Sequence, residues 1–311
     1  MNFSGKTILV TGASGFVGSH IIAALQNTGA RIIGLARKDS SLQRLDQLQA
    51  SCSLLFVDIL DDDAIKAIVA PLKPDYVFNT ITCRHIADEQ QLFAVNGKAQ
   101  LNLLQAASSP SLQAFVHCGS SMEYGTLASP LKESVHIQPD TPYGISKAEG
   151  TRLLQQYALS NALPLVILRP FYIYGPTASA RQFIPVVIDA LLQNREISLT
   201  TPGYQHDFVY IQDVVEACLL AAASATTRAL LPGKIINIAS GGGTRNEEII
   251  AHLAKLSGKS ALVNSGGFTA RPWDRPSWYA DITLAKELID WSPRHDLLTG
   301  LQKTLEWHLA Q

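Results

Sequence analysis

The sequence predicts an α/β protein in which a doubly wound parallel sheet carries a smaller C-terminal lobe. Three observations predict this fold class. Short apolar runs alternate with stretches of helical periodicity through the first half of the chain, a glycine-rich turn follows the first run, and the alternation becomes irregular after Pro170. Buried parallel strands read as continuous apolar runs, and alternating strand and helix units imply right-handed crossovers.

The elements of the first half follow in a regular order. Six apolar runs predict strands over residues 6–10, 31–36, 54–57, 75–79, 114–118 and 165–169. Apolar residues recurring at helical spacing predict helices between them, over residues 16–27, 92–107 and 143–159. These strands and helices form the predicted sheet and its two covering layers.

The second half returns to the sheet and also leaves it. Turns at Gly175-Pro176 and Pro202-Gly203 precede a predicted helix over residues 214–223, a strand over 234–238 and, after three glycines, a helix over 246–256. We therefore predict a first domain over residues 1–170, to which 214–239 return. Residues 171–213 and 240–311 form the predicted smaller lobe.

Composition excludes several classes of protein. The 311 residues are 47% hydrophobic with a formal net charge of -1, so neither a disordered chain nor a general field for nucleic acid or an anionic membrane is expected. Four cysteines without a CxxC pair predict no disulfide framework and no metal site. No signal segment and no apolar run of about 18 residues is found, so we expect a cytoplasmic protein.

A glycine-rich turn joins the first strand to the first helix. Glycines at 12, 15 and 18 permit a tight turn and the close approach of a pyrophosphate, which the N-terminus of the helix then attracts. An ordinary glycine-rich loop is the alternative, but the position after the first strand favours a dinucleotide and a Rossmann fold. The predicted contacts are Gly12, Ser14, Gly15, Phe16, Val17 and Gly18.

The end of the second strand bears on the choice of cofactor. Arg37 and Lys38 stand where a carboxylate would bind the ribose of NAD, and a basic residue suits the 2′-phosphate of NADP. We therefore expect NADP, with NAD as the alternative cofactor. The alternative without a ligand is that Arg37 and Lys38 are a solvated pair on the surface. Asp58, with Ile59, follows the third strand and either contacts the adenine or begins a helix.

A hydroxyl, a phenol and an amine predict catalysis. Tyr143 and Lys147 lie one helical turn apart, so the ammonium should favour the phenolate and lower the pKa of the tyrosine. Ser120 follows the strand over 114–118, at the edge where open α/β sheets bind ligands. A surface pair and a turn serine are the structural alternatives.

Together these motifs make the chain resemble an extended short-chain dehydrogenase/reductase of the branch that acts on nucleotide sugars. The resemblance extends over nearly the whole chain. Its matching motifs are Gly12-x-x-Gly15-x-x-Gly18, Val95-Asn96-Gly97, Ser120-Ser121-x-Glu123-Tyr124-Gly125, Tyr143-x-x-x-Lys147, Arg169-Pro170-Phe171, Asp207-Phe208-Val209 and Arg271-Pro272-x-Asp274. It implies catalytic Ser120, Tyr143 and Lys147 and a structural Asn96. It also implies that Tyr143 and Lys147 contact the cofactor, Lys147 at the nicotinamide ribose, with Phe171 and Ile173 beside the nicotinamide.

The resemblance leaves the reaction open among three outcomes. Dehydratases of the family carry an acid pair or a lone Glu directly after the catalytic Ser or Thr, where this chain has Ser121 and Met122. The run 119–125 is more similar to GDP-4-keto-6-deoxymannose reductases. We therefore expect NADP-dependent reduction of a nucleotide-linked 4-keto-6-deoxysugar, with NAD-dependent 4-epimerisation as the alternative. A dinucleotide-binding redox sensor is the alternative without catalysis.

The expected substrate residues lie mostly in the smaller lobe. The resemblance implies that Arg271 clamps the diphosphate and that Asp274 contacts a ribose. His206 and Tyr172 replace the Arg and Asn that are usual in the family. The full set expected to contact substrate is Arg84, Ser121, Glu123, Tyr172, Arg181, His206, Arg271 and Asp274. By resemblance alone, helices 92–107 and 143–159 would form the interface of a homodimer.

Overall fold

A seven-stranded parallel sheet forms the centre of the molecule. The computed structural model describes residues 3–83, 88–200, 202–227, 232–267 and 275–311. The strands run in the order β3-β2-β1-β4-β5-β6-β11, and every neighbouring pair is parallel. They are β1 (Thr7–Thr11), β2 (Arg31–Ala36), β3 (Ser53–Phe56), β4 (Tyr76–Asn79), β5 (Ala114–Cys118), β6 (Leu165–Pro170) and β11 (Lys234–Ile238). The predicted fold class is thereby confirmed, and the edge strand β11 comes from the second half of the chain.

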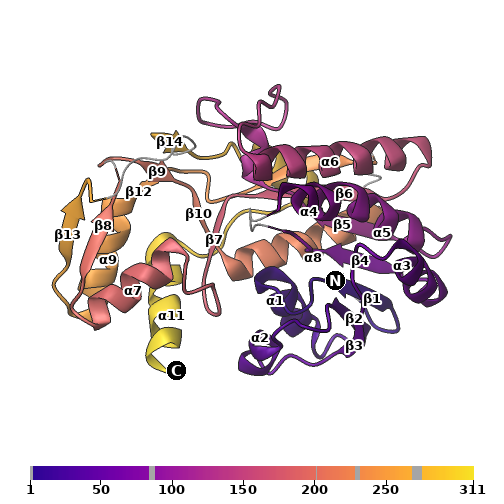
Figure 1. Ribbon diagram of the computed structural model, residues 1–311, viewed down its shortest axis with the longest axis horizontal. Coiled ribbons are helices and arrows are strands. Elements are labelled where there is room, and N and C mark those ends of the chain that lie inside the picture. Colours follow the sequence, from indigo (N-terminus) through magenta and orange to yellow (C-terminus); the bar gives the residue numbers. More distant parts are fainter. Residues whose placement is uncertain (1–2, 84–87, 201, 228–231, 268–274) are drawn as a thin grey trace.

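Helices cover both faces of this sheet (Figure 1). Because successive side chains of a strand point to opposite faces, Ile8 and Val10 pack on one side and Leu9 packs on the other. The first face is covered by α1 (Phe16–Leu25) and α8 (Ile211–Thr227), and the second by α3 (Asp62–Val69), α5 (Ala99–Ala107) and α6 (Pro142–Ser160). The strand order reverses between β1 and β4, which is where such sheets bind ligands.

The helix predicted over 92–107 is not continuous. The structure has α4 (Glu89–Phe93), a π-helical turn over Ala94–Lys98, and then α5. Asn96, in this turn, accepts the Cys83 amide proton and donates to the Cys83 carbonyl, both at 2.9 Å. A π turn contains one residue more than the corresponding turn of an α-helix. In this turn the side chain of Asn96 binds the loop after β4.

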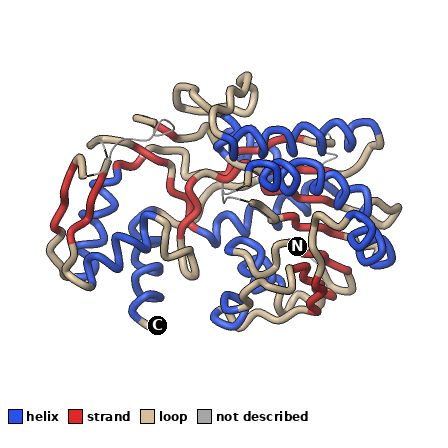
Figure 2. Tube along the Cα trace, in the orientation of Figure 1, coloured by secondary structure: helices blue, strands red, loops and turns tan. Residues whose placement is uncertain are grey.

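A smaller lobe lies beside the sheet in Figures 1 and 2. Its short strands are β7 (Tyr172–Tyr174) paired with β10 (Phe208–Tyr210), β8 (Glu196–Leu199) paired with β13 (Leu262–Ser265), and β12 (Thr244–Arg245), β9 (Gln205–His206) and β14 (Ser277–Trp278) in one sheet. Its helices are α7 (Phe183–Leu192), α9 (Asn246–Ser257) and α11 (Leu297–Leu309). Short α2 (Gln43–Gln47) and α10 (Thr283–Ile289) complete the helices of the described residues.

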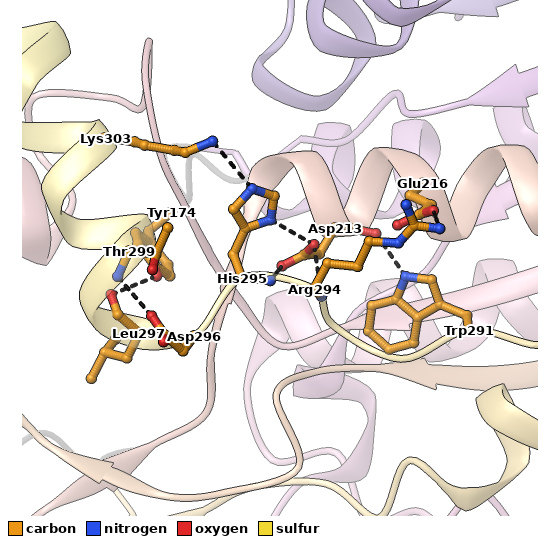
Figure 3. Close-up of polar contacts among 10 residues, drawn as sticks. All are labelled: Tyr174, Asp213, Glu216, Trp291, Arg294, His295, Asp296, Leu297, Thr299 and Lys303. Atoms are coloured by element: carbon orange, nitrogen blue, oxygen red, sulfur yellow. Dashed lines mark hydrogen bonds and ion pairs between the residues drawn. The ribbon is translucent and has the colours of Figure 1, made fainter.

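Two buried aspartates attach the C-terminal segments to the rest of the chain. Asp207 accepts backbone protons from Ser240, Gly241 and Ala280, and its burial raises the pKa of this carboxyl. Asp213, at the start of α8, accepts protons from the backbone of Arg294 and His295 and contacts the His295 ring at 2.8 Å (Figure 3). Each carboxylate therefore joins segments that are far apart in sequence.

His20 links α1 to the loop after β7. Its Nε2 lies 3.0 Å from the Pro176 carbonyl and 3.1 Å from the Thr177 hydroxyl. Burial lowers its pKa from 6.5 to about 4, against the opposing effect of the Pro176 contact. The folded protein therefore holds this imidazole neutral at pH values where the unfolded chain protonates it.

Stability should consequently fall as the pH drops from 6.5 towards 4. Between these values the unfolded state binds more protons at His20, and the full shift corresponds to about 3 kcal/mol of unfolding free energy. We expect urea unfolding of His20→Gln to depend less on pH over this window than that of the wild type. Parallel pH profiles for the two proteins would contradict the assignment.

Candidate functional site

A cavity of about 1130 Å³ lies at the carboxyl ends of the strands. Its walls come from the turn after β1, the segments after β2, β3, β4 and β5, the start of α6, and the lobe residues His206, Arg275 and Trp278. The cavity therefore lies between the sheet and the lobe, and it includes the point where the strand order reverses.

The glycine-rich turn forms one end of this cavity. Gly12 has a φ of +66°, and a Cβ atom on it would lie 2.8 Å from the Thr80 hydroxyl. A Cβ atom on Gly18 would lie 2.3 Å from the Gly12 carbonyl, so the turn packs directly on α1. Ser14, Gly15, Phe16 and Val17 line the cavity together with Gly12, whereas Gly18 supports the turn from beneath. The cradle and the exposed N-terminus of α1 fit a pyrophosphate.

The end of the cavity formed by the segments after β2 and β3 contains charges of both signs. Arg37, Asp39, Asp58 and Ile59 all line the cavity. Arg37 forms an exposed ion pair with Asp39, with 3.5 Å between Nε and Oδ1. The N-cap of α3 is Asp61, which accepts the Ala64 amide proton, so Asp58 does not begin that helix. A second hollow of about 640 Å³ adjoins this end and includes Lys38.

Two members of the expected catalytic set line the middle of the cavity. Ser120 begins a 3₁₀ turn over Ser121–Tyr124, and its hydroxyl accepts the Met122 amide proton at 3.2 Å. Tyr143 lies in the first turn of α6, which Thr141 caps by accepting the Gly144 amide proton. The phenol oxygen of Tyr143 lies 3.3 Å from the Thr82 hydroxyl.

Lys147 lies behind this wall. Its side chain is 1% exposed, and Nζ donates a hydrogen bond of 2.7 Å to the Cys118 carbonyl at the end of β5. It stands one turn after Tyr143 on the same face of α6. A fully buried His117 lies in the same strand, and burial, followed by the charge of Lys147, lowers the pKa of that imidazole well below its usual value.

Glu123 does not contact the cavity, and this corrects our expectation for it. Its carboxylate is fully buried, accepts the Ser120 amide proton at 2.8 Å, and forms an ion pair with Arg169 at 2.9 Å. The Arg169 guanidinium also lies over the Tyr124 ring at 4.7 Å. Both carboxylate oxygens of Glu123 are therefore used to hold the turn that carries Ser120.

The remaining predictions for the substrate end separate into two groups. Ser121, Tyr172, Arg181 and His206 line the cavity, as do Phe171 and Ile173, which were expected beside the nicotinamide. Tyr172 is held from behind, because its hydroxyl accepts the Phe183 amide proton and its ring packs on Phe208 at 4.8 Å. Arg84, Arg271 and Asp274 lie outside the described residues.

Several lining residues were not predicted from the sequence, and two of them, Arg275 and Thr82, make contacts that bear on Tyr143 and its helix. Arg275 forms an ion pair with Asp140, just before the cap of α6, and so connects the lobe to the helix that carries Tyr143. Thr82 follows β4 and contacts Tyr143. The available signals were a charged residue directly after Asp274 in the sequence and a hydroxyl at the carboxyl end of a strand. Within the residues that the structure describes, there is no cluster of three His, Cys, Asp or Glu that could hold a metal ion, and no helix with the length and apolarity to cross a membrane.

Comparison with known proteins gives consistent matches over the chain. A sequence profile described as the NAD dependent epimerase/dehydratase family matches residues 8–239. Human dTDP-D-glucose 4,6-dehydratase is 29% identical over 97% of this chain and 90% of its own length. UDP-glucose 4-epimerase of Mycolicibacterium smegmatis is 29% identical over 96% of this chain and 97% of its own. The structure of UDP-glucuronic acid 4-epimerase from Bacillus cereus, in complex with UDP-glucuronic acid and NAD, matches with a TM-score of 0.87 and 28% identity, covering 98% of this chain and 99% of that one.

Proposed function

The chain belongs to the NAD-dependent epimerase/dehydratase family, and from this membership we propose that it catalyses the 4-epimerisation of a hexose linked to a pyrimidine nucleoside diphosphate. The relatives named above act on UDP- or dTDP-linked sugars, which share a pyrimidine base and a diphosphate. The proposal replaces 4-keto reduction, which the sequence alone favoured, with the alternative that the relatives support better.

The burial of Glu123 is the observation that favours epimerisation over dehydration. Dehydration needs two further groups in addition to the chemistry at C4. A base must remove the proton at C5, and an acid must protonate the hydroxyl that leaves C6. The acid nearest to Ser120 in sequence is fully buried and paired with Arg169, so it is unavailable for that step. Epimerisation at C4 requires one proton acceptor beside the sugar oxygen and a carrier for the hydride, which fits the set that lines the cavity.

The residues of the chain supply proton transfer and orientation. Tyr143 takes the proton from the C4 hydroxyl when the carbon is oxidised and returns it when the carbon is reduced on the opposite face. Ser120 donates a hydrogen bond to the same sugar oxygen, and the ammonium of Lys147, one helical turn away, favours the ionised phenol. The glycine-rich turn with Phe171 and Ile173 would hold a nicotinamide dinucleotide, and that group would supply reversible hydride transfer at the sugar carbon.

We propose NAD, in place of the NADP expected from Arg37 and Lys38. The Bacillus cereus relative is described in complex with NAD. In this chain Arg37 forms an ion pair with Asp39. The carboxylates of Asp39 and Asp58 line the same end of the cavity, where they can accept hydrogen bonds from ribose hydroxyls. A 2′-phosphate would meet these two negative charges as well as Arg37.

One experiment tests the reaction and the cofactor together. We expect the purified protein to release NAD on denaturation, and the native protein to convert UDP-glucose, UDP-glucuronic acid or dTDP-glucose into its C4 epimer, detected by NMR, without consuming added NADPH. If the wild-type protein released NADP and the Arg37→Ala variant did not, the cofactor would be NADP, as Arg37 and Lys38 first indicated. Oxidation of NADPH by 4-keto-6-deoxysugars would identify a reductase, a 4-keto-6-deoxy product a dehydratase, and bound dinucleotide without turnover a sensor.

A further inference from the structure

The loop after β4 runs along the cavity directly opposite the start of α6. Thr80, Ile81, Thr82 and Cys83 all line the cavity. The Thr82 side chain is exposed there, and its hydroxyl lies 3.3 Å from the phenol oxygen of Tyr143. Thr82 thus places a second hydroxyl beside the group to which the proposed function assigns proton transfer.

Asn96 fixes the position of this loop relative to α6. Its amide binds both backbone groups of Cys83, and it also donates a hydrogen bond of 3.0 Å to the Ser146 hydroxyl. Ser146 in turn donates to the Tyr143 carbonyl at 2.9 Å. Asn96 in the π turn therefore connects the loop that carries Thr82 to the first turn of α6, which carries Tyr143.

The Thr82 hydroxyl has partners for both of its hydrogen-bonding functions. It lies 3.5 Å from the Asn96 amide oxygen, which can only accept. With its proton directed to Asn96, it can accept the proton of a neutral phenol. Rotated about its C–O bond, it can donate the same proton to an ionised phenol.

We propose that Thr82 is a positioning residue for Tyr143, holding the phenol oxygen over the cavity in both of the protonation states through which the reaction passes. This inference rests on the proposed function for the role of Tyr143, but the contact itself does not depend on which sugar is bound. The amine on the same helix is Lys147, whose Nζ is held by the Cys118 carbonyl, so Thr82 and Lys147 act on Tyr143 from different elements.

Loss of the hydroxyl should disfavour the ionised phenol more than the neutral one. A hydrogen bond to an ionised acceptor is about twice as strong as one between neutral groups, so the pH at which Tyr143 ionises should rise by roughly 0.5–1 unit. Because the misplaced phenol affects proton transfer and not the binding of the nucleotide, kcat should fall by about tenfold while KM stays close to that of the wild type.

The test compares two substitutions that differ in the hydroxyl. Thr82→Val keeps the shape of the side chain without the hydroxyl, and Thr82→Ser keeps the hydroxyl. Both are studied as the dinucleotide-bound protein, by steady-state kinetics and by ultraviolet titration of Tyr143, taken as the difference from Tyr143→Phe. We expect Thr82→Val to show the lower kcat and the higher titration midpoint, and Thr82→Ser to restore both.

Thr151→Val is the matched control. Thr151 lies two turns along α6 from Tyr143, and its buried hydroxyl has no hydrogen-bond partner in the described part of the chain. Removing it should leave the titration of Tyr143 unchanged. Wild-type kcat and titration in Thr82→Val, or equal losses in Thr82→Val and Thr82→Ser, would overturn the proposal. A titration that depends on the Thr82 hydroxyl in a protein without epimerase activity would refute the proposed function and leave the positioning role standing.

Discussion

Tyr143→Phe should lower the turnover of the proposed epimerase by ~10²–10⁴-fold, the usual contribution of a positioned acid–base group. The substitution removes only the phenol oxygen, which lines the cavity beside Thr82 and near Ser120. The ring and the N-terminal turn of α6, capped by Thr141, should remain in place. Bound dinucleotide, measured after denaturation, is therefore expected at the wild-type amount, and only the rate of C4 epimerisation should fall.

A second tyrosine of the same helix provides the control. Tyr157 lies on α6 outside the residues that line the cavity, and it packs against the core on the face of the sheet that α6 covers. Tyr157→Phe should keep wild-type turnover. Wild-type rates in Tyr143→Phe, with the cofactor bound, would remove the phenol from the reaction.

Arg169→Met should lower the unfolding free energy by about 3–5 kcal/mol, the usual cost of leaving one member of a buried ion pair alone. Arg169 is 2% exposed and Glu123 is fully buried, so solvent cannot replace the guanidinium. The substitution also removes the contact of Arg169 with the Tyr124 ring. Urea unfolding at neutral pH measures the loss.

A double substitution separates the charge from the packing. Arg169→Met combined with Glu123→Gln leaves no uncompensated carboxylate, so it should be more stable than Arg169→Met alone. A loss of less than about 1 kcal/mol in Arg169→Met would mean that Glu123 is already hydrated or protonated in the folded protein.

The strands could be predicted closely because their signal is local. Residues 31–36, 114–118 and 234–238 are strands with the predicted bounds, because parallel strands buried on both faces are mostly apolar and their signal lies in adjacent residues. The helix over 92–107 has an equally regular apolar pattern, yet it contains a π turn. The π turn contains Asn96, whose hydrogen-bond partners Cys83 and Ser146 lie 13 and 50 residues away, and such contacts leave no signal in the local apolar pattern.

The site was predicted where one motif places a residue, and missed where two distant segments meet. Ser120, Tyr143 and the glycine-rich turn line the cavity as their motifs indicated. Glu123 carries a carboxylate at a plausible position, but its partner Arg169 lies 46 residues further on, and only the fold shows that they pair. Thr82 gains its contact with Tyr143 in the same way, across 61 residues.

The aspartate anchors limit how such a protein can be recombined. Asp207 and Asp213 belong to the central part of the chain, but their partners lie at residues 240, 241 and 280 and at 294 and 295. A chimera that takes residues 240–311 from a relative of different specificity would have to inherit backbone geometry that fits these two carboxylates. An exchange of this C-terminal segment can therefore transfer specificity only if the new segment places backbone amides where Asp207 and Asp213 accept hydrogen bonds.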